Sequence, residues 1–222
     1  GCELDVMTSA PERQRAAPHS ASVPRTEDRM RTVKNATWAA LAAFSCAALL
    51  WSGGSSAQAP LDGATKAAAR NLAIGVCASC HGVEGRSTNP LIPRLAGQQH
   101  AYIEAQLKSF RTQSRSDPDA HDYMWGVAAT LNDSIIVALA DYFSSQSPVR
   151  GTPGDSATLA AGRQLYEKGD PGRGIQACAT CHGADAQGAS VFPRLAGQQS
   201  QYLVKQMQML RVRLRASPVM HG

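Results

Sequence analysis

The sequence predicts an all-α protein built from two copies of one small domain, and three observations support that prediction. The segment Pro-Arg-Leu-Ala-Gly-Gln-Gln at residues 93–99 returns unchanged at residues 193–199. Apolar side chains recur at the spacing of amphipathic helices, and strand-like alternation is almost absent. Residues 147–155 contain two prolines and two glycines, which interrupt regular structure between the copies. A duplication of this kind sets the domain count before any motif is interpreted.

The duplication extends to both sides of the repeated segment. Downstream, matched residues lie a hundred positions apart, as in Tyr102 and Tyr202, Gln106 and Gln206, and Arg111 and Arg211. Upstream, Cys-Ala-Ser-Cys-His-Gly at residues 77–82 corresponds to Cys-Ala-Thr-Cys-His-Gly at residues 178–183. We therefore expect a first domain over residues 60–148, a linker over residues 149–155 and a second domain over residues 156–222.

Five helices are expected from the apolar spacing. Asp62 is a suitable N-cap for a helix over residues 64–76, and Asp133 or Ser134 for a helix over residues 135–143. The other expected helices cover residues 99–110, 156–169 and 199–214. The second copy thus repeats the first two helices of the first copy and has no counterpart of the third.

The N-terminal region has the features of a secretory signal peptide, predicted over residues 30–59. A short basic segment, residues 30–34, precedes an apolar run over residues 36–51, and Ala57-Gln58-Ala59 fits a cleavage site. The run is too short to span a bilayer comfortably, and a retained N-terminal helix is the alternative. Residues 1–29 match neither a signal nor a domain and are left unassigned, as upstream or disordered sequence. We accordingly expect a periplasmic protein.

Composition and charge exclude nucleic-acid binding as the main function. The net charge is +5, but the lysines and arginines are spread along the chain and do not cluster with aromatic residues. Hydrophobic residues make up 43% of the chain, as in an ordinary globular protein, while aromatic residues make up only 5%. Two small domains with so few aromatic side chains leave room for a prosthetic group in each core.

Each copy carries Cys-x-x-Cys-His, the attachment signal for c-type haem. Two thiols three positions apart lie near one turn of helix, where they can add to the two vinyl groups on one edge of the porphyrin. The adjacent His then provides the proximal iron ligand. We expect two covalently attached haem c groups, one in each copy. The attaching residues are Cys77, Cys80 and His81 in the first copy, and Cys178, Cys181 and His182 in the second.

Three other uses of these cysteines fit the sequence less well. A zinc ribbon places its two Cys-x-x-Cys units about 15–20 residues apart, whereas these units lie about a hundred residues apart. A thioredoxin-like motif should lie in a βαβ pattern, which the sequence does not show. Structural disulfides, common in secreted proteins, do not explain why a His follows each pair.

The sixth iron ligand is expected to be a methionine in each copy. Met124 and Met220 occupy matching positions of the repeat, in Met-Trp-Gly and Met-His-Gly. His100 and His121 are the other candidates in the first copy, but Ser200 takes the place of His100, and His121 has no useful counterpart. A thioether ligand raises the iron potential and fills the position where oxygen or a substrate would bind, which argues against catalysis. The alternative is that each methionine only fills core space.

Two further repeated pairs are candidates for supporting roles. The carbonyl of Pro93 or Pro193 can accept the Nδ1–H of the proximal imidazole and fix the ring, or the proline can simply stiffen a loop. Arg94 and Arg194 can pair with the haem propionates, whose charge is costly to bury, or stay solvated.

From residue 60 onward the chain resembles the dihaem cytochrome c4 family. The resemblance rests on the Cys-His blocks with Pro-Arg-Leu-Ala-Gly-Gln, on Met-Trp-Gly-Val-Ala-Ala-Thr-Leu at residues 124–131 and on Ala-Asp-Tyr-Phe-Ser-Ser-Gln at residues 140–146. It implies two class I cytochrome c domains in tandem, each with a His/Met haem. It also matches Pro93 and Pro193 to the proline that binds the proximal His. The chain departs from the family in that its second domain lacks the C-terminal helix, so that Met220 is expected to bind its iron weakly.

The resemblance implies a carrier of single electrons, with no enzymatic activity and no small-molecule substrate. The expected partners are redox proteins of the respiratory chain, such as a quinol-oxidising complex and a terminal oxidase, and peripheral membrane association is compatible with this role. One alternative is a haem-bearing subunit of a periplasmic dehydrogenase or oxidase complex. Another is a ligand-binding or peroxidase-like haem protein, which would require an open sixth position.

Overall fold

The first helix begins where the sequence predicts it. In the computed structural model, which describes residues 60–220, helix α1 (Gly63–Leu72) follows Asp62. The Asp62 carboxylate accepts a hydrogen bond from the Thr65 N–H at 2.6 Å, as an N-cap does. The predicted cap is therefore confirmed.

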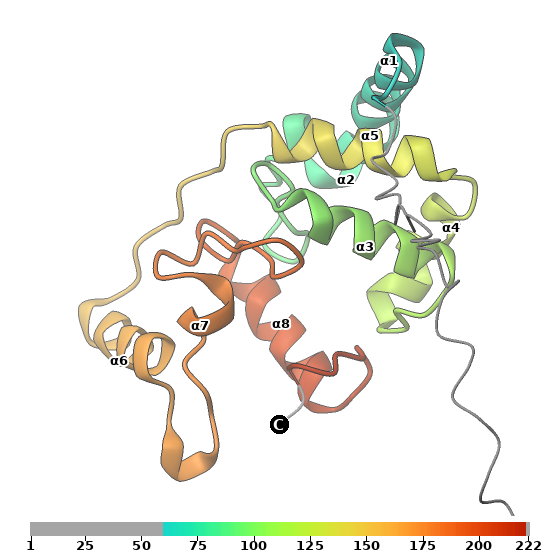
Figure 1. Cartoon of the computed structure of the whole chain (residues 1–222). Helices are drawn as coiled ribbons and strands as arrows, with labels where there is room; N and C mark the ends of the chain where they lie inside the picture. The colour runs from blue at the N-terminus through green and yellow to red at the C-terminus, as the bar shows by residue number, and fades with distance from the viewer. Residues whose placement is uncertain (1–59, 221–222) are drawn as a thin grey trace, which may run out of the picture. The chain divides into compact units, whose positions relative to one another are not determined.

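All regular elements within residues 60–220 are helical, so the all-α prediction is confirmed (Figure 1). The first half (residues 60–148) contains, after α1, the π-helical turn η1 (Ala73–Cys77), α2 (Ala78–His81), the 3₁₀ turn η2 (Val83–Gly85), α3 (His100–Arg111), the π-helical turn η3 (Ala120–Met124), α4 (Trp125–Ala128) and α5 (Asp133–Ser144). The second half (residues 156–222) contains α6 (Ser156–Lys168), the 3₁₀ turn η4 (Pro171–Arg173), α7 (Ala179–His182) and α8 (Ser200–Arg211). The β pairing in this part of the chain is limited to two isolated bridges.

Two other sequence predictions concern the membrane and the N-terminal region. The predicted signal peptide over residues 30–59 and the unassigned residues 1–29 lie outside the described residues. Where the chain is described, no single helix is long and apolar enough to cross a membrane. One bent helix pair, Ala120–Ala128 with Asp133–Ser144, meets the test by length and composition only.

The N-terminus of α5 differs from the prediction for a local reason. The N-cap of α5 is Asn132, whose side chain accepts the Ile135 N–H at 2.9 Å, and not Asp133 or Ser134. Asp133 instead pairs with Arg111 of α3 at 2.6 Å. Sequence alone could not rank three adjacent residues that all favour cap positions.

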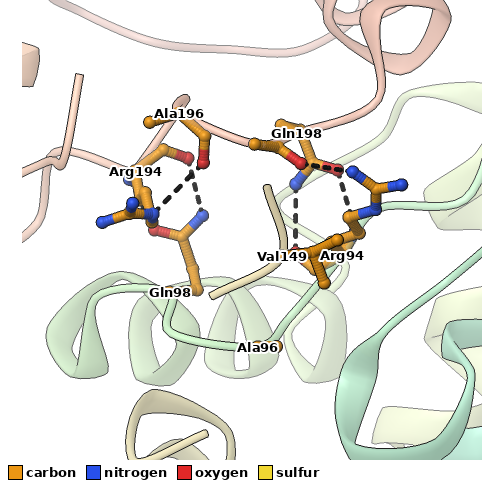
Figure 2. A pocket seen from close by; sticks show the side chains of 8 residues that line it. Arg94, Ala96, Gln98, Val149, Arg194, Ala196 and Gln198 are labelled. Carbon is orange, nitrogen blue, oxygen red and sulfur yellow. Dashed lines mark hydrogen bonds between the residues drawn. The ribbon is translucent and has the colours of Figure 1, made fainter. Parts of the chain in front are cut away.

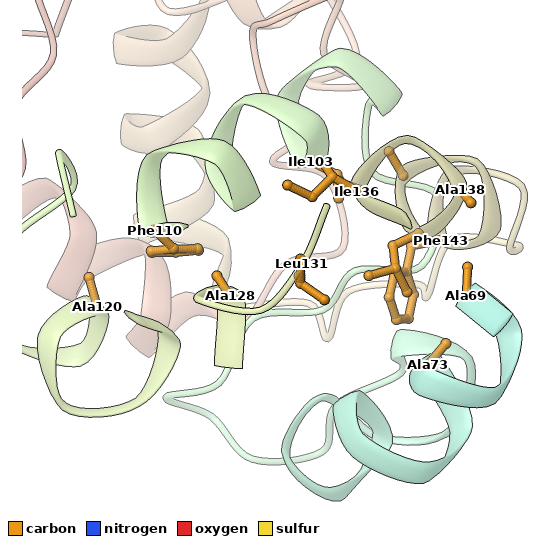
Figure 3. Packing of buried hydrophobic residues seen from close by; sticks show 12 residues of the cluster. Ala69, Ala73, Ile103, Phe110, Ala120, Ala128, Leu131, Ile136, Ala138 and Phe143 are labelled. Atoms are coloured by element: carbon orange, nitrogen blue, oxygen red, sulfur yellow. The ribbon is translucent and has the colours of Figure 1, made fainter. Parts of the chain in front are cut away.

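The core of the first half is built around α5, which packs against both α1 and α3. Its buried face contains Ile136, Leu139 and Phe143, at the spacing of one helical stripe. Figure 3 shows side chains from the neighbouring elements pointing towards this face. These neighbours include Ala69 of α1, Ala73 of η1, and Ile103 and Phe110 of α3.

The second half contains far less buried apolar surface. Leu210 is its only buried hydrophobic side chain among the described residues. Helix α6 contains no buried residue, whereas α1 buries Ala69 completely. In the first half α5 covers α1 and α3, whereas among the described residues no helix packs in this way against both α6 and α8.

Two equivalent glutamines connect the halves, which lie in one compact unit of the chain. The Gln98 amide donates to the Arg194 carbonyl at 3.0 Å, and its oxygen accepts the Arg194 N–H at 2.6 Å. Gln198 makes the same two contacts with Arg94, at 3.0 and 2.8 Å. Figure 2 shows Gln98 beside Arg194 and Gln198 beside Arg94. The repeated segment thus contacts its own copy, with the same atoms used in each direction.

Candidate haem sites

The first Cys-His block lies where three helical elements succeed one another. Helix α1 continues into η1, which ends at Cys77, and α2 then carries Cys80 and His81. Single π-helical turns are rare and occur frequently at functional sites. Gly82 ends α2 with a φ of 76°, and a Cβ at this position would lie 2.8 Å from the Arg86 carbonyl oxygen. The glycine after His81 is therefore required by the backbone.

The imidazole of His81 is oriented for metal binding through one of its nitrogens. Its Nδ1 lies 2.9 Å from the Pro93 carbonyl oxygen, and because a carbonyl only accepts, Nδ1 carries the proton. The Nε2 lone pair is then the one available to iron. Burial lowers the pKa of His81 below its ordinary value, against the opposing effect of the Pro93 carbonyl. The ring is therefore neutral, as a ligand must be, and the expected hydrogen bond to Pro93 is confirmed.

The second block repeats this geometry on a different backbone path. His182 ends α7, and its Nδ1 lies 2.9 Å from the Pro193 carbonyl oxygen. A segment containing η4 separates α6 from α7, where the first half has a continuous helical run. Tyr166 of α6 donates its hydroxyl to the Gly183 carbonyl at 2.5 Å and thereby connects α6 to the block. The expected Pro193 hydrogen bond is confirmed as well.

Met124 lies at the edge of the first-half core. It ends η3, and its partly buried side chain packs against the hydrophobic cluster. Cys77 and Leu95 also pack against that cluster. A candidate distal ligand and a candidate attachment thiol thus border the same apolar region, which is the arrangement that one enclosed haem would need.

The two histidine alternatives in the first half have other partners. The Nε2 of His100 lies 3.0 Å from the Asp141 carboxylate. The Nδ1 of His121 lies 2.7 Å from Asp122, and its side chain is 64% exposed. Its ring also contacts the edge of Trp125 at a centroid distance of 4.8 Å. Met124 is therefore the better candidate for the sixth ligand.

Met220 has a different environment from Met124. It lies in a turn, 47% exposed, and its N–H donates to the Ser217 hydroxyl at 3.1 Å. The structure thus places Met220 outside any buried cluster, and as a distal ligand it remains a proposal.

The donor chemistry of both blocks fits a covalently attached haem. The four described cysteines form no disulfide with one another, which leaves both thiols of each block to attach a haem. Apolar side chains close to the blocks in sequence are exposed, including Val83 (74%), Leu91 (48%) and Val191 (54%). A porphyrin offers apolar surface of the kind that would cover such side chains.

The alternative uses of the cysteines find less support in the geometry. Among residues 60–220 no group of three or more His, Cys, Asp and Glu side chains is arranged to hold a metal ion. Both blocks lie on short helices in all-α surroundings, whereas a thioredoxin-like motif needs a βαβ unit.

The structure gives Arg94 a role that the sequence did not predict. Its guanidinium donates to the Gly197 carbonyl at 2.6 Å and to the Ser87 carbonyl at 3.1 Å, so that it links the halves. Arg194 donates to the Ala196 carbonyl within its own half, at 3.1 Å. Pairing of either arginine with a propionate remains a proposal.

Sequence reasoning also missed a buried polar cluster between the halves. Its central residues are Gln106, Arg115, Gln206 and Arg215. The available signal was their recurrence a hundred positions apart, because polar residues repeated together at helical and post-helical positions indicate a shared contact.

Comparison with known proteins agrees with this geometry. The sequence model of the cytochrome c family matches residues 66–147 and 159–221. Cytochrome c-552 of Acidithiobacillus ferridurans is 46% identical over 133 residues, which span 59% of this chain and 58% of that protein. Cytochrome c4 of Thiocapsa roseopersicina is 37% identical over 148 residues, 65% of this chain and 74% of that protein.

Two further proteins are similar to the chain: a relative named as an electron acceptor and a cytochrome c4 of known structure. The "thiosulfate dehydrogenase electron acceptor" of Thiomonas intermedia is 36% identical over 174 residues, 75% of this chain and 72% of that protein. The structure of Acidithiobacillus ferrooxidans cytochrome c4 aligns with a TM-score of 0.61 and 42% identity, over 65% of this chain and 85% of that chain. The family model matches each half once, and the match to the Thiocapsa roseopersicina protein covers 74% of that cytochrome c4. The chain therefore belongs to the dihaem cytochrome c4 family and carries two covalently bound haem c groups.

Proposed function

We propose that the chain is a periplasmic carrier of single electrons between proteins of a respiratory chain, in the direction of a terminal oxidase. Its two haem domains are residues 60–148 and 156–222, joined by the linker 149–155. The observation that carries the proposal is the pair of proximal histidines, each with Nδ1 bound to a proline carbonyl at 2.9 Å. This geometry suits a permanent iron ligand and provides no catalytic acid or base.

The proposed ligand sets follow from the repeat. Attachment is assigned to Cys77, Cys80, Cys178 and Cys181; iron ligation is assigned to His81, Met124, His182 and Met220. When bound, the haem supplies a reversible one-electron change. If these His and Met side chains hold the iron in each half, no bond at the iron would have to form or break during electron transfer.

The proposed partners are redox proteins, such as a quinol-oxidising complex as donor and a terminal oxidase as acceptor. With both iron positions held by protein side chains, each haem would offer no site to a small-molecule substrate, as expected of a carrier without enzymatic activity. A secreted location follows from the predicted signal peptide, and peripheral association with the membrane would bring the carrier close to membrane-bound partners. The relatives that are named cytochrome c4 support the carrier role.

The first test is the intact mass of the secreted protein, produced together with a haem-attachment system. We expect a polypeptide that begins near Pro60 and carries two covalent haems. The double variant Cys178→Ser with Cys181→Ser should carry one. A protein with no haem, and with disulfides or zinc in its place, would refute the proposal.

A second candidate is a dedicated electron-accepting subunit for a periplasmic dehydrogenase. The similarity to the thiosulfate dehydrogenase electron acceptor of Thiomonas intermedia favours it, since that match covers 75% of this chain. Stopped-flow reduction of the holoprotein can separate the two. Fast reduction by a thiosulfate dehydrogenase with thiosulfate, and slow reduction by a quinol-oxidising complex, would favour the second candidate.

A further inference from the structure

A ring of two arginines and two glutamines joins the halves. Arg115 donates to the Oε1 of Gln106 at 2.7 Å and to the Oε1 of Gln206 at 3.0 Å. Arg215 donates to the Oε1 of Gln206 at 2.6 Å and to the Oε1 of Gln106 at 3.2 Å. Each guanidinium therefore bridges one glutamine of its own half and one of the other half. We call these four residues the Arg–Gln ring.

The two arginines of the ring lie on the segments that lead to the candidate distal ligands. Arg115 belongs to residues 112–124, which run from α3 to Met124, and Arg215 belongs to residues 212–220, which run from α8 to Met220. We call these the methionine segments. The indole Nε1–H of Trp125, the residue after Met124, donates to the Arg115 carbonyl at 2.8 Å. The position of Arg115 is thereby linked to that of Met124.

The second half also contacts the first methionine segment at a second point. Lys205 of α8 lies 2.7 Å from the carboxylate of Asp119, the residue immediately before η3. Both side chains are about one-third exposed, at 30% and 34%. Helix α8 therefore contacts the first methionine segment at two points, Asp119 through Lys205 and Arg115 through Gln206.

The charges around the ring show why the two guanidinium groups need the glutamine oxygens as hydrogen-bond acceptors. Asp117, whose side chain is 1% exposed, neutralises Arg115 at 2.7 Å. Ser217 stands at the equivalent position of the second half, and Arg215 instead donates to the Tyr102 hydroxyl at 2.8 Å. Among residues 60–220 no carboxylate lies within ion-pair distance of Arg215. Arg115 thus has a carboxylate partner and Arg215 has none within residues 60–220, so the glutamine oxygens must offset the rest of the cost of burying the two guanidinium groups.

We propose that α8 of the second half is the positioning element for Met124 of the first, acting through Gln206 and Lys205. The proposal rests on the proposed function, because it takes Met124 as the distal ligand of the first haem. The first haem keeps its sixth ligand firmly only while the second half is docked. Arg215, bound to Tyr102 and Gln106, positions the second methionine segment in the same way.

The test uses the full-length dihaem protein and the variants Gln206→Met and Lys205→Met. Gln206→Met removes the shared acceptor at similar volume, and Lys205→Met removes the ion pair with Asp119. The first measured quantity is the cyanide affinity of the oxidised protein at the first haem. A separate NMR experiment on the reduced protein records the signal of the methionine methyl group bound to the iron. That signal is assigned by its loss in Met124→Ala. We expect cyanide affinity to rise about tenfold, because a hydrogen bond to a charged group supports the native loop.

The matched control is Lys108→Met, which removes an ion pair with Glu104 (2.6 Å) that lies wholly within the first half. It should leave cyanide affinity unchanged, while Lys205→Glu combined with Asp119→Lys should restore the wild-type value. Unchanged affinity in both test variants, or an equal rise in Lys108→Met, overturns the proposal. A wild-type protein without the Met124 methyl signal overturns the ligand assignment itself, which separates that failure from failure of the positioning role.

Discussion

Met124 and Met220 occupy equivalent positions of the repeat but have different surroundings. Met124 is partly buried against the first-half core, whereas Met220 lies 47% exposed in a turn. A thioether binds iron strongly only when its loop is already ordered. Packing contacts then offset the conformational entropy lost on ordering the loop, so the iron–sulfur bond does not have to. The two methionines should therefore differ as iron ligands even though their residue type is the same.

Substitution of Met124 by Ala should open the first haem to external ligands. We expect the reduced variant to bind carbon monoxide and the reduction potential of the first haem to fall, because a thioether ligand raises it. Carbon monoxide difference spectra and redox titration measure both effects. Met207→Ala, at a methionine that is 63% exposed on α8, serves as the control and should change neither.

The ion pair between Asp133 and Arg111 predicts that the free energy of unfolding depends on pH in the acidic range. The hydrogen bond and charge of Arg111 hold the pKa of Asp133 below its ordinary value. The stability from this pair is therefore present above the unfolded pKa of about 4 and is lost as the pH falls through the lower folded pKa. Denaturant unfolding of wild type and Asp133→Asn should differ near neutral pH and converge in acid. A difference that persists or grows in acid would contradict this assignment.

At the level of the helices, α5 determines how stable each half is. It covers α1 and α3 and buries Ile136 completely. The face of α8 that corresponds to the covered face of α3 leaves Met207 exposed (63%), and α6 leaves Leu159 exposed (51%). Helices of this length depend on such packing, because their intrinsic stability in water is marginal.

Shortening Ile136 should destabilise the first half in graded steps. Ile136→Val should cost about 1 kcal/mol and Ile136→Ala about 2–5 kcal/mol, since the second leaves a larger cavity. Chemical denaturation of the holoprotein, followed by the fluorescence of Trp125, measures the change. Equal effects of the two substitutions would mean that the site can collapse around the smaller side chain.

Helix α6 should exchange its amide hydrogens faster than α1 in the 222-residue chain. The helices are equivalent in the repeat and carry equivalent caps, since Asp62 binds the Thr65 N–H and Asp155 binds the Thr158 N–H. They differ in burial, because α6 has no buried residue. Hydrogen exchange resolved along the chain tests this prediction. Equal protection of the two helices would show that another contact of α6 replaces the packing that α5 gives α1.

At the scale of the whole molecule, the duplication provides its own interface. Gln98 and Gln198 exchange contacts with Arg194 and Arg94, and the Arg–Gln ring repeats the same principle between α3 and α8. Because both contacts use equivalent residues of the two copies, the halves bind each other as two subunits of a symmetric dimer would. The haem domains are thereby held in a defined arrangement through polar contacts.

Gln98→Leu should weaken this arrangement without removing either haem. The Gln98 side chain belongs to a residue that is only 6% exposed, and its loss leaves the Arg194 N–H and carbonyl without these partners. An unsatisfied buried polar group costs about 1–3 kcal/mol. We expect faster hydrogen exchange at the Arg194 amide and earlier separation of the halves in denaturant. Gln113→Leu, at an exposed position of the first half, should change neither.

The haem chemistry could be predicted from sequence because it is encoded locally. In each Cys-His block two thiols and an imidazole fall within five consecutive residues, so that helical geometry alone brings them together. The same holds for the repeat, for the apolar stripe of α5 and for the Asp62 cap. The hydrogen bonds of Pro93 and Pro193 could also be predicted from sequence, because in each copy the proline follows its histidine by about a dozen residues.

What the tertiary structure decided are the contacts whose partners lie about a hundred residues apart. Arg94 was expected to pair with a propionate or to stay solvated, and neither alternative included the hydrogen bond that its guanidinium donates to the Gly197 carbonyl. No local pattern specifies that Arg115 donates to Gln206 or that Lys205 pairs with Asp119, because each side chain has many possible partners of equal chemistry. Only the packing of the two halves selects among them, since burial makes one pairing far less costly than the others.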